Sequence, residues 1–268
     1  MPYIRINGAE LWYEDTGGSL PPILFSHGLL FSARLFDAQV EALKDRYRCV
    51  VYDHRGQGRS APSTMRSIDI ETLTTDAMLL IEGLKIAPVH FCGLSMGGFV
   101  GMRLAARRPD LIRSLVLLAT SADPEAPENL ARFRLMNLVA RFCGISLVVD
   151  RTMKIMFGRS TLADPTRAAE RHAWRAALLS NRRRIWRAVN GVIERQGIGD
   201  ELFSIKAPTL VVVGAEDMAT TPSKAEAIHA AIEGSRLLCI PGCGHTAPWE
   251  KPVAVNAALA DFLAAQPE

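Results

Sequence analysis

The stretch HFCGLSMGGFVGMRLAAR, residues 90–107, decides the fold of this chain. A short apolar run ends in Gly-Leu-Ser-Met-Gly, and helical spacing of apolar residues begins directly after it. This pattern predicts a strand, a sharp turn with Ser95 at its apex, and a helix. Gly93 and Gly97 suit a turn in which the two backbones pass too close for a Cβ atom. The predicted geometry exposes Ser95 as a nucleophile at a helix N-terminus, which favours negative charge. The alternative is a tight turn with an idle serine.

Strand and helix patterns alternate on both sides of this stretch. Strands alternating with helices predict an α/β fold with a mostly parallel sheet and an antiparallel pair near the start. The expected strands are residues 3–6, 10–14, 23–26, 49–52, 115–118, 209–213 and 236–240, besides the one before Ser95. The expected helices are residues 33–43, 70–84, 223–232 and 253–263, besides the one after Ser95.

The pattern changes near residue 120. Residues 121–204 show helical segments and no convincing strand. We therefore expect a core made of residues 1–120 and 205–268, with a helical cap of residues 121–204 inserted after the sixth strand. Such insertions leave the core intact and can close a site from water.

Composition limits the functional classes. The chain has 268 residues, of which 49% are hydrophobic and 22% charged, as in a globular protein with a large core. Its net charge of +3 does not indicate nucleic-acid binding. No apolar run reaches membrane-spanning length, and the first residues do not resemble a signal peptide. We expect a cytoplasmic protein with no nucleic-acid or membrane partner, and its oligomeric state stays open.

The five cysteines are odd in number and form no C-x-x-C pair. Cys49, Cys92 and Cys239 lie in apolar runs, which predicts reduced and mostly buried thiols. Cys239 and Cys243 have no second cysteine pair beside them, and no metal-ligand spacing is present, so we predict no metal.

The loop of residues 53–60 is rich in glycine, but no G-x-G-x-x-G opens a helix there. A rigid turn held by Asp53 and Arg55 is the preferred interpretation over a phosphate site. We therefore predict that the protein needs no cofactor.

A base and an acid for Ser95 are sought at the ends of later strands, where open α/β sheets place their sites. His245 follows the last strand in a glycine-rich loop and is the predicted base. Asp217 follows the preceding strand and is the predicted acid, in the chain order Ser, Asp, His. Glu216 and Asp123 are its rivals.

Backbone amides are the expected donors to an oxyanion. Met96 follows the nucleophile and supplies one amide. Leu29, after His27 and Gly28, supplies the second.

Together these pieces resemble the α/β-hydrolase superfamily over nearly the whole chain outside the cap. The matching motifs are His27-Gly28, Asp53–Ser60, Gly93–Gly98, Gly214–Asp217 and Gly244-His245. Within the superfamily the chain most resembles the branch of 3-oxoadipate enol-lactonases, cofactor-free perhydrolases and carboxylesterases. The resemblance implies an eight-stranded sheet with helices on both faces, a helical cap and a Ser95–His245–Asp217 triad.

The predicted function is a serine hydrolase that cleaves a small-molecule carboxylic ester or lactone through an acyl-enzyme. Two alternatives stay open. One is hydrolysis of a carbon–carbon bond in a ring-cleavage product by the same triad. The other is a ligand receptor with slow turnover on the same fold.

The cap is expected to choose the substrate. Its net charge is +5 and that of the remainder is −2. One interpretation is that an arginine binds a substrate carboxylate; the preferred one is a solvated helix face for Arg182, Arg183 and Arg184. The candidate pocket residues are Leu30, Phe133, Phe142, Met153, Met156, Phe157, Trp174 and Trp186.

Overall fold

The computed structural model describes residues 2–266. Residues 1, 267 and 268, at the ends of the predicted core, lie outside the described residues. The strands are Tyr3–Ile6 (β1), Ala9–Asp15 (β2), Pro22–Ser26 (β3), Arg48–Tyr52 (β4), Val89–Leu94 (β5), Ile112–Leu118 (β6), Thr209–Gly214 (β7) and Arg236–Ile240 (β8). They form one sheet in the order β1-β2-β4-β3-β5-β6-β7-β8. β1 and β2 are antiparallel, as is the β2–β4 pair, and β4, β3, β5, β6, β7 and β8 pair in parallel. The predicted sheet is confirmed.

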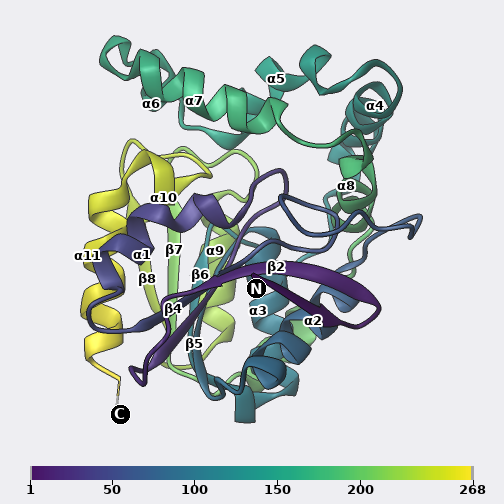
Figure 1. Ribbon diagram of the computed structural model, residues 1–268. Coiled ribbons are helices and arrows are strands. Elements are labelled where there is room, and N and C mark those ends of the chain that lie inside the picture. Colours follow the sequence, from purple (N-terminus) through teal and green to yellow (C-terminus); the bar gives the residue numbers. More distant parts are fainter. Residues whose placement is uncertain (1, 267–268) are drawn as a thin grey trace.

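Helices lie on both faces of the sheet (Figure 1). Those of the flanking layers are Asp37–Leu43 (α1), Ile70–Leu84 (α2), Met96–Arg107 (α3), Pro222–Ala231 (α9), Ala247–Glu250 (α10) and Pro252–Ala264 (α11). Between β6 and β7 the chain forms Pro127–Cys143 (α4), Val149–Met156 (α5), Arg159–Ala163 (α6), Ala168–Leu179 (α7) and Trp186–Ile193 (α8). Short 3₁₀ turns are Ala33–Phe36 (η1), Pro109–Leu111 (η2), Ile145–Leu147 (η3), Pro165–Arg167 (η4), Arg183–Ile185 (η5) and Gly199–Ser204 (η6).

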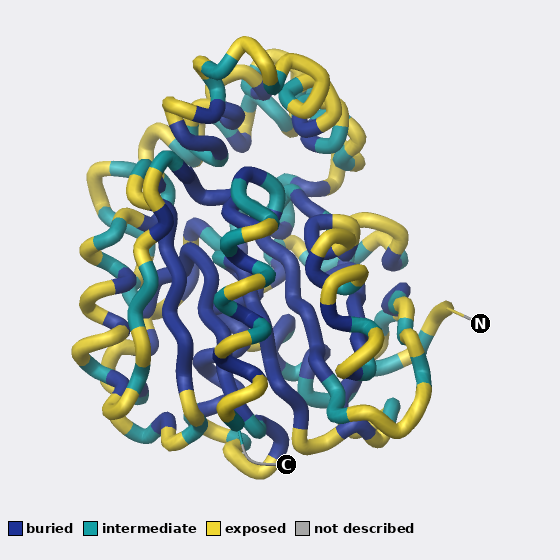
Figure 2. The backbone as a smooth tube through the Cα atoms, turned by 90° about the vertical axis from the view of Figure 1, so that its left-hand side faces the viewer, coloured by how far each residue is buried: buried dark blue, intermediate teal, exposed yellow. Residues whose placement is uncertain are grey.

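The central strands are buried on both faces, as the dark tube in Figure 2 shows. Because side chains alternate along a strand, β6 sends Leu115 and Leu117 into the core under α2 and α3, and Val116 and Leu118 into the core under α1 and α11. This double burial explains why these strands read as continuous apolar runs rather than alternating ones.

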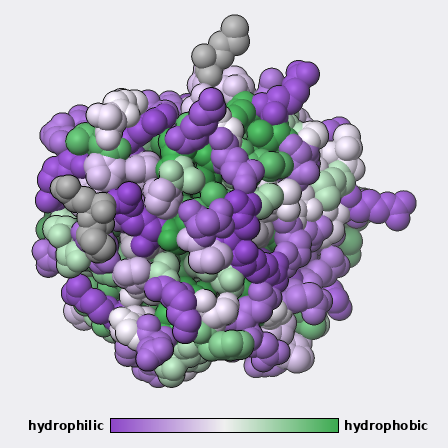
Figure 3. Space-filling view, turned by 90° about the horizontal axis from the view of Figure 1, so that it is seen from below, coloured by the Kyte–Doolittle hydropathy of each residue, from purple (hydrophilic) through white to green (hydrophobic). Residues whose placement is uncertain are grey.

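The inserted helices α4 to α8 lie above one edge of the sheet (Figure 1). Every residue from 121 to 204 is described, and none belongs to a strand. On the opposite side of the molecule, hydrophilic and hydrophobic residues are interspersed over the surface (Figure 3).

The cysteine prediction is wrong for Cys239. Cys49, Cys92 and Cys243 are buried, whereas Cys239 and Cys143 are exposed. The reason is that β8 is an edge strand, so an apolar run there has one side open to solvent.

Candidate active site

Ser95 stands at the junction of β5 and α3 with φ 52° and ψ −109°, a conformation that non-glycine residues rarely adopt. Its N–H donates to the Leu118 carbonyl (2.9 Å), and its own carbonyl accepts from the Thr120 hydroxyl (2.8 Å). A Cβ atom on Gly97 would lie 2.0 Å from the Ser26 carbonyl oxygen, so glycine is required for α3 to pass β3 this closely. The predicted turn is therefore present, with Ser95 at its apex.

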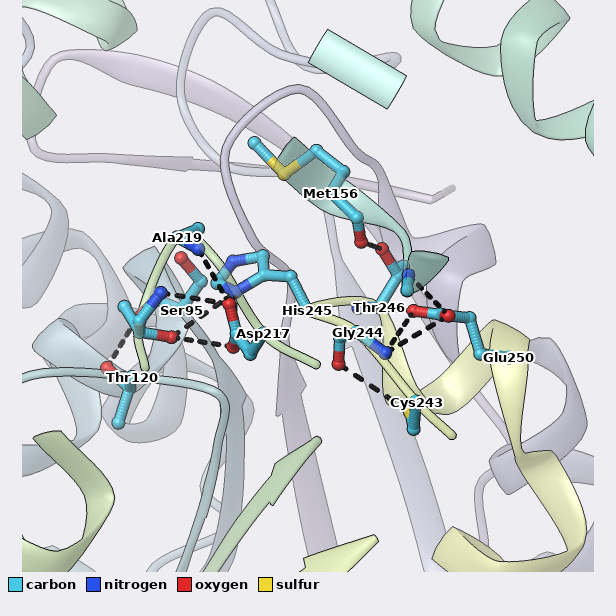
Figure 4. A network of polar contacts seen from close by, with 12 residues as sticks. Ser95, Thr120, Met156, Asp217, Ala219, Cys243, Gly244, His245, Thr246 and Glu250 are labelled. Carbon is cyan, nitrogen blue, oxygen red and sulfur yellow. Dashed lines mark hydrogen bonds and ion pairs between the residues drawn. The ribbon is translucent and has the colours of Figure 1, made fainter. Parts of the chain in front are cut away.

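His245 and Asp217 contact each other directly. His245 Nδ1 lies 2.9 Å from Asp217 Oδ2, and both residues are buried. Since a carboxylate accepts, Nδ1 carries the proton and Nε2 is free to act as a base. Ser95 and His245 line the same cavity, and Figure 4 draws the serine beside the imidazole.

Asp217 is held by its own turn. Oδ1 accepts from the amides of Ala219 (2.8 Å) and Thr220 (2.9 Å), and Oδ2 accepts from the Thr220 hydroxyl (2.9 Å). These donors fix the position of the carboxylate against His245.

The two rival acids bind elsewhere. Glu216 accepts from the amide and the hydroxyl of Ser160 in α6, and this contact lowers the pKa of its carboxyl. Asp123 forms an ion pair with Lys224 of α9. The N-cap of α4 is Ala126.

The loop that carries His245 is fixed by Glu250, which sequence reasoning missed. The buried Glu250 carboxylate accepts from the amides of Gly244 (3.1 Å) and Thr246 (3.2 Å), on either side of His245, and from Gly158 (2.8 Å) at the start of α6 (Figure 4). The sequence shows an acid five residues after His245, but the partners of Glu250 are backbone atoms that no motif reveals.

The loop after β3 is ordered by His27. His27 Nε2 accepts from the His54 amide (3.0 Å), so its Nδ1–H donates to the Gly28 carbonyl (2.8 Å). Burial lowers the pKa of His27, which keeps this tautomer neutral. Among the hydrogen bonds of residues 2–266, none uses the amides of Leu29 or Met96. Both predicted oxyanion donors are thus unoccupied by other parts of the described chain.

The neighbouring loop has the predicted rigid form. Asp53 accepts from the amides of Ala33 (2.7 Å) and Arg59 (2.7 Å), and Arg55 forms a buried ion pair with Asp76.

The cavity at Ser95 extends between α4 and α8, and residues of both helices line it. Of the predicted pocket residues, Leu30, Phe133 and Met156 line it. Most of the remaining wall is apolar. It includes Phe99, Met136, Ala140, Ile145, Val148, Ile155, Ile185, Val189 and Val192.

Five pocket predictions are wrong, because those side chains face away from the cavity. Phe142 is 61% exposed. Met153, Phe157 and Trp174 pack into the core cluster on the α1 and α11 side, where the rings of Phe157 and Trp174 stack at 4.6 Å. Trp186 lies under the guanidinium of Arg141 at 4.1 Å.

Two charged residues in the cavity wall were also missed. Glu125 precedes α4 and Arg195 follows α8, and they form a buried ion pair (2.9 Å). They are 70 residues apart in sequence, so no local pattern links them. Arg182, Arg183 and Arg184 are exposed, as predicted for a solvated face.

A second cavity lies on the other side of Leu30, beside the loop of residues 53–60 and the end of α7. Leu30 lines both cavities. It has φ 71°; its N–H donates to Gln57 (3.2 Å) and its carbonyl accepts from Asn181 (2.8 Å).

Comparison with known proteins identifies the family. The family model of the alpha/beta hydrolase fold matches residues 21–252. The chain belongs to the α/β-hydrolase fold family. The structure of this α/β hydrolase is similar to the enol-lactonase of Burkholderia xenovorans LB400, with a TM-score of 0.90 and 30% identity over 98% of this chain and 100% of that one.

Two further structures are similar. A thermophilic esterase of Thermogutta terrifontis matches with a TM-score of 0.88 and 30% identity, covering 98% of this α/β hydrolase and 96% of the esterase. A hydrolase of Pseudomonas aeruginosa PA01 matches with a TM-score of 0.87 and 30% identity, covering 98% of each chain.

No group of three or more His, Cys, Asp or Glu side chains within residues 2–266 is placed to hold a metal ion. No helix in that part of the chain is long and apolar enough to cross a membrane.

Proposed function

We propose that this α/β hydrolase cleaves carboxylic esters or lactones, with Ser95 as nucleophile, His245 as general base and Asp217 as the acid that orients it. The observation that carries the proposal is the 2.9 Å contact between His245 Nδ1 and Asp217 Oδ2, with His245 and Ser95 both lining one cavity. The similar enol-lactonase and esterase support it. We also propose that residues 121–204 form a cap that shapes the pocket over a core of residues 1–120 and 205–268.

The mechanism follows from the hydrogen bonds. His245 Nε2 takes the Ser95 proton as Oγ attacks the carbonyl carbon, and Asp217 stabilises the imidazolium that forms. The unoccupied amides of Leu29 and Met96 donate to the oxyanion. The alcohol leaves with a proton from His245. Water, activated by the same imidazole, then releases the acid from Ser95.

A substrate panel with one variant tests the proposal. We expect the wild type to hydrolyse p-nitrophenyl esters or simple lactones, and Ser95→Ala to lower kcat by about a thousandfold or more with an unchanged circular dichroism spectrum. Ser223→Ala, an exposed serine in α9, is the matched control. Equal rates for Ser95→Ala and wild type would refute the nucleophile. A wild type that cleaves dienoic ring-cleavage products but no ester or lactone would refute the bond type.

A further inference from the structure

The Glu125–Arg195 pair lies close to the nucleophile. The Arg195 guanidinium carbon is 4.5 Å from the centre of the Phe99 ring, and the Phe99 amide donates to the Ser95 carbonyl. Phe99 is one turn of α3 beyond Ser95, a rise of about 5 Å. Ser95, Phe99 and the pair line the same cavity, so a substrate whose carbonyl carbon is at Ser95 can extend within that cavity toward the pair.

Part of each charged side chain is already bonded. Arg195 Nε donates to the Asp123 carbonyl (3.1 Å), and Nη1 donates to Glu125 (2.9 Å) and to the Val192 carbonyl (2.9 Å). Within residues 2–266, Arg195 Nη2 has no hydrogen-bond partner. Glu125 accepts from Arg195 and from Asn129 (3.0 Å), which leaves lone pairs on its carboxylate. The pair thus offers both donors and acceptors to a ligand.

The charges of the pair compensate each other. The side chains of Arg195 and Glu125 are only 6% and 12% exposed, and most of the wall around them is apolar. Burial lowers the pKa of Arg195, and the bond to Glu125 opposes that effect. A further charge brought into such a site would lose its hydration without finding an uncompensated partner.

We propose that the Glu125–Arg195 pair selects esters or lactones that carry a neutral polar group, a primary carboxamide or a hydroxyl, and discriminates against substrates with a second carboxylate. A carboxamide oxygen accepts from Arg195 Nη2 while its NH₂ donates to Glu125. A carboxylate matches the arginine but places a second negative charge beside Glu125. This inference rests on the proposed ester or lactone hydrolysis and names its substrate class.

Matched substrate pairs provide the test. In the acyl series, p-nitrophenyl adipamate is compared with mono-p-nitrophenyl adipate, which differ in CONH₂ against COO⁻. In the alcohol series, the acetate ester of γ-hydroxybutyramide is compared with that of γ-hydroxybutyrate. A pH indicator reports the acetic acid released from each ester. p-Nitrophenyl hexanoate reports basal activity. We expect the wild type to prefer the amide in kcat/KM by about tenfold or more in the series whose polar group reaches the pair.

Glu125→Gln assigns the preference to the pair. Glutamine keeps an oxygen that accepts from Arg195 but removes the negative charge, so we expect the amide-to-carboxylate ratio to fall by about tenfold. Glu128→Gln removes the same charge from an exposed position in α4 and should leave the ratio unchanged.

The outcomes separate the two proposals. If hexanoate is cleaved but the wild type shows no amide preference in either series, or prefers the carboxylate, the inference fails and the hydrolase assignment stands. If Glu125→Gln and Glu128→Gln change the ratio equally, the pair is not the selector. If no ester or lactone is cleaved, the proposed function itself fails. The wild-type ratio decides the matter even if Glu125→Gln does not fold.

Discussion

The carboxylate of Glu250 accepts a hydrogen bond of 2.8 Å from the backbone amide of Gly158, which joins α10 to the start of α6. The same carboxylate accepts from the amides on both sides of His245. One buried side chain therefore ties the proposed cap to the proposed base.

Replacing Glu250 by glutamine should weaken both connections. Both carboxylate oxygens accept from amides, so the glutamine NH₂ would face N–H donors and leave them unsatisfied. We expect a loss of about 2–3 kcal/mol in the free energy of unfolding, measured in urea, and a lower kcat. Glu226→Gln, exposed in α9, is the control. Wild-type stability for Glu250→Gln would show that the carboxylate is not needed.

Asparagine at position 217 distinguishes the proposed acid from its rival. Asp217→Asn removes the charge that holds the Nδ1–H tautomer of His245, and a fall in kcat of about a thousandfold to ten-thousandfold is expected. Asp123→Asn breaks only the ion pair with Lys224 and should change kcat less than about twofold. Steady-state kinetics on one p-nitrophenyl ester decides between them, and the opposite ranking would reassign the acid.

Stability should decrease in mild acid because of buried histidines. Burial lowers the pKa of His90 to about 4, and the pKa values of His27 and His54 are also lowered. Below about pH 6.5 the unfolded chain binds protons that the folded chain does not, so unfolding becomes easier as pH falls.

His90→Asn should remove one part of this pH dependence, because asparagine does not titrate in this range. The asparagine amide can still contact Ser114, so the packing of the site is kept. We expect the loss of unfolding free energy between about pH 7.5 and pH 5 to shrink by about 1–2 kcal/mol. His172→Asn, at an exposed site, should leave the loss unchanged. Equal losses for His90→Asn and wild type would assign the acid sensitivity to other groups.

Gly97 should tolerate no side chain. Alanine there would place Cβ 2.0 Å from the Ser26 carbonyl oxygen, so α3 or β3 must move. We expect Gly97→Ala to cost about 3 kcal/mol or more, or to prevent folding. Gly199→Ala meets no atom within 4 Å and should change the free energy of unfolding by less than about 0.5 kcal/mol. Thermal melting of both variants checks this, and similar melting temperatures would contradict it.

The sheet and the sharp turn at Ser95 were predictable because the sequence patterns that indicate them are local. β5 and α3 differ in apolar period, and the turn between them requires glycine at position 93, where a Cβ would lie 2.4 Å from the backbone of Gly97, only four residues along the chain. The loop at His245 follows the last strand directly. Parallel strands end at one edge of the sheet, so residues far apart in sequence are predictably brought together there.

The pocket was not predictable in the same way. Some apolar side chains of the inserted segment line the cavity and others pack into the core, and composition does not say whether Phe157 or Phe133 faces the cavity. The Glu125–Arg195 pair depends on how α4 lies against α8, which is a tertiary relationship. Cys239 was misjudged because strand order, not strand composition, decides which strand is at the edge.

Leu30 forms part of the partition between two internal spaces while its backbone is in the left-handed region. Glycine at this position would relieve the backbone and remove the isobutyl group, while its N–H and C=O still bond to Gln57 and Asn181. Because Leu30 lines both cavities, removing its isobutyl group would open the cavity at Ser95 toward the second one and offer a product another route out.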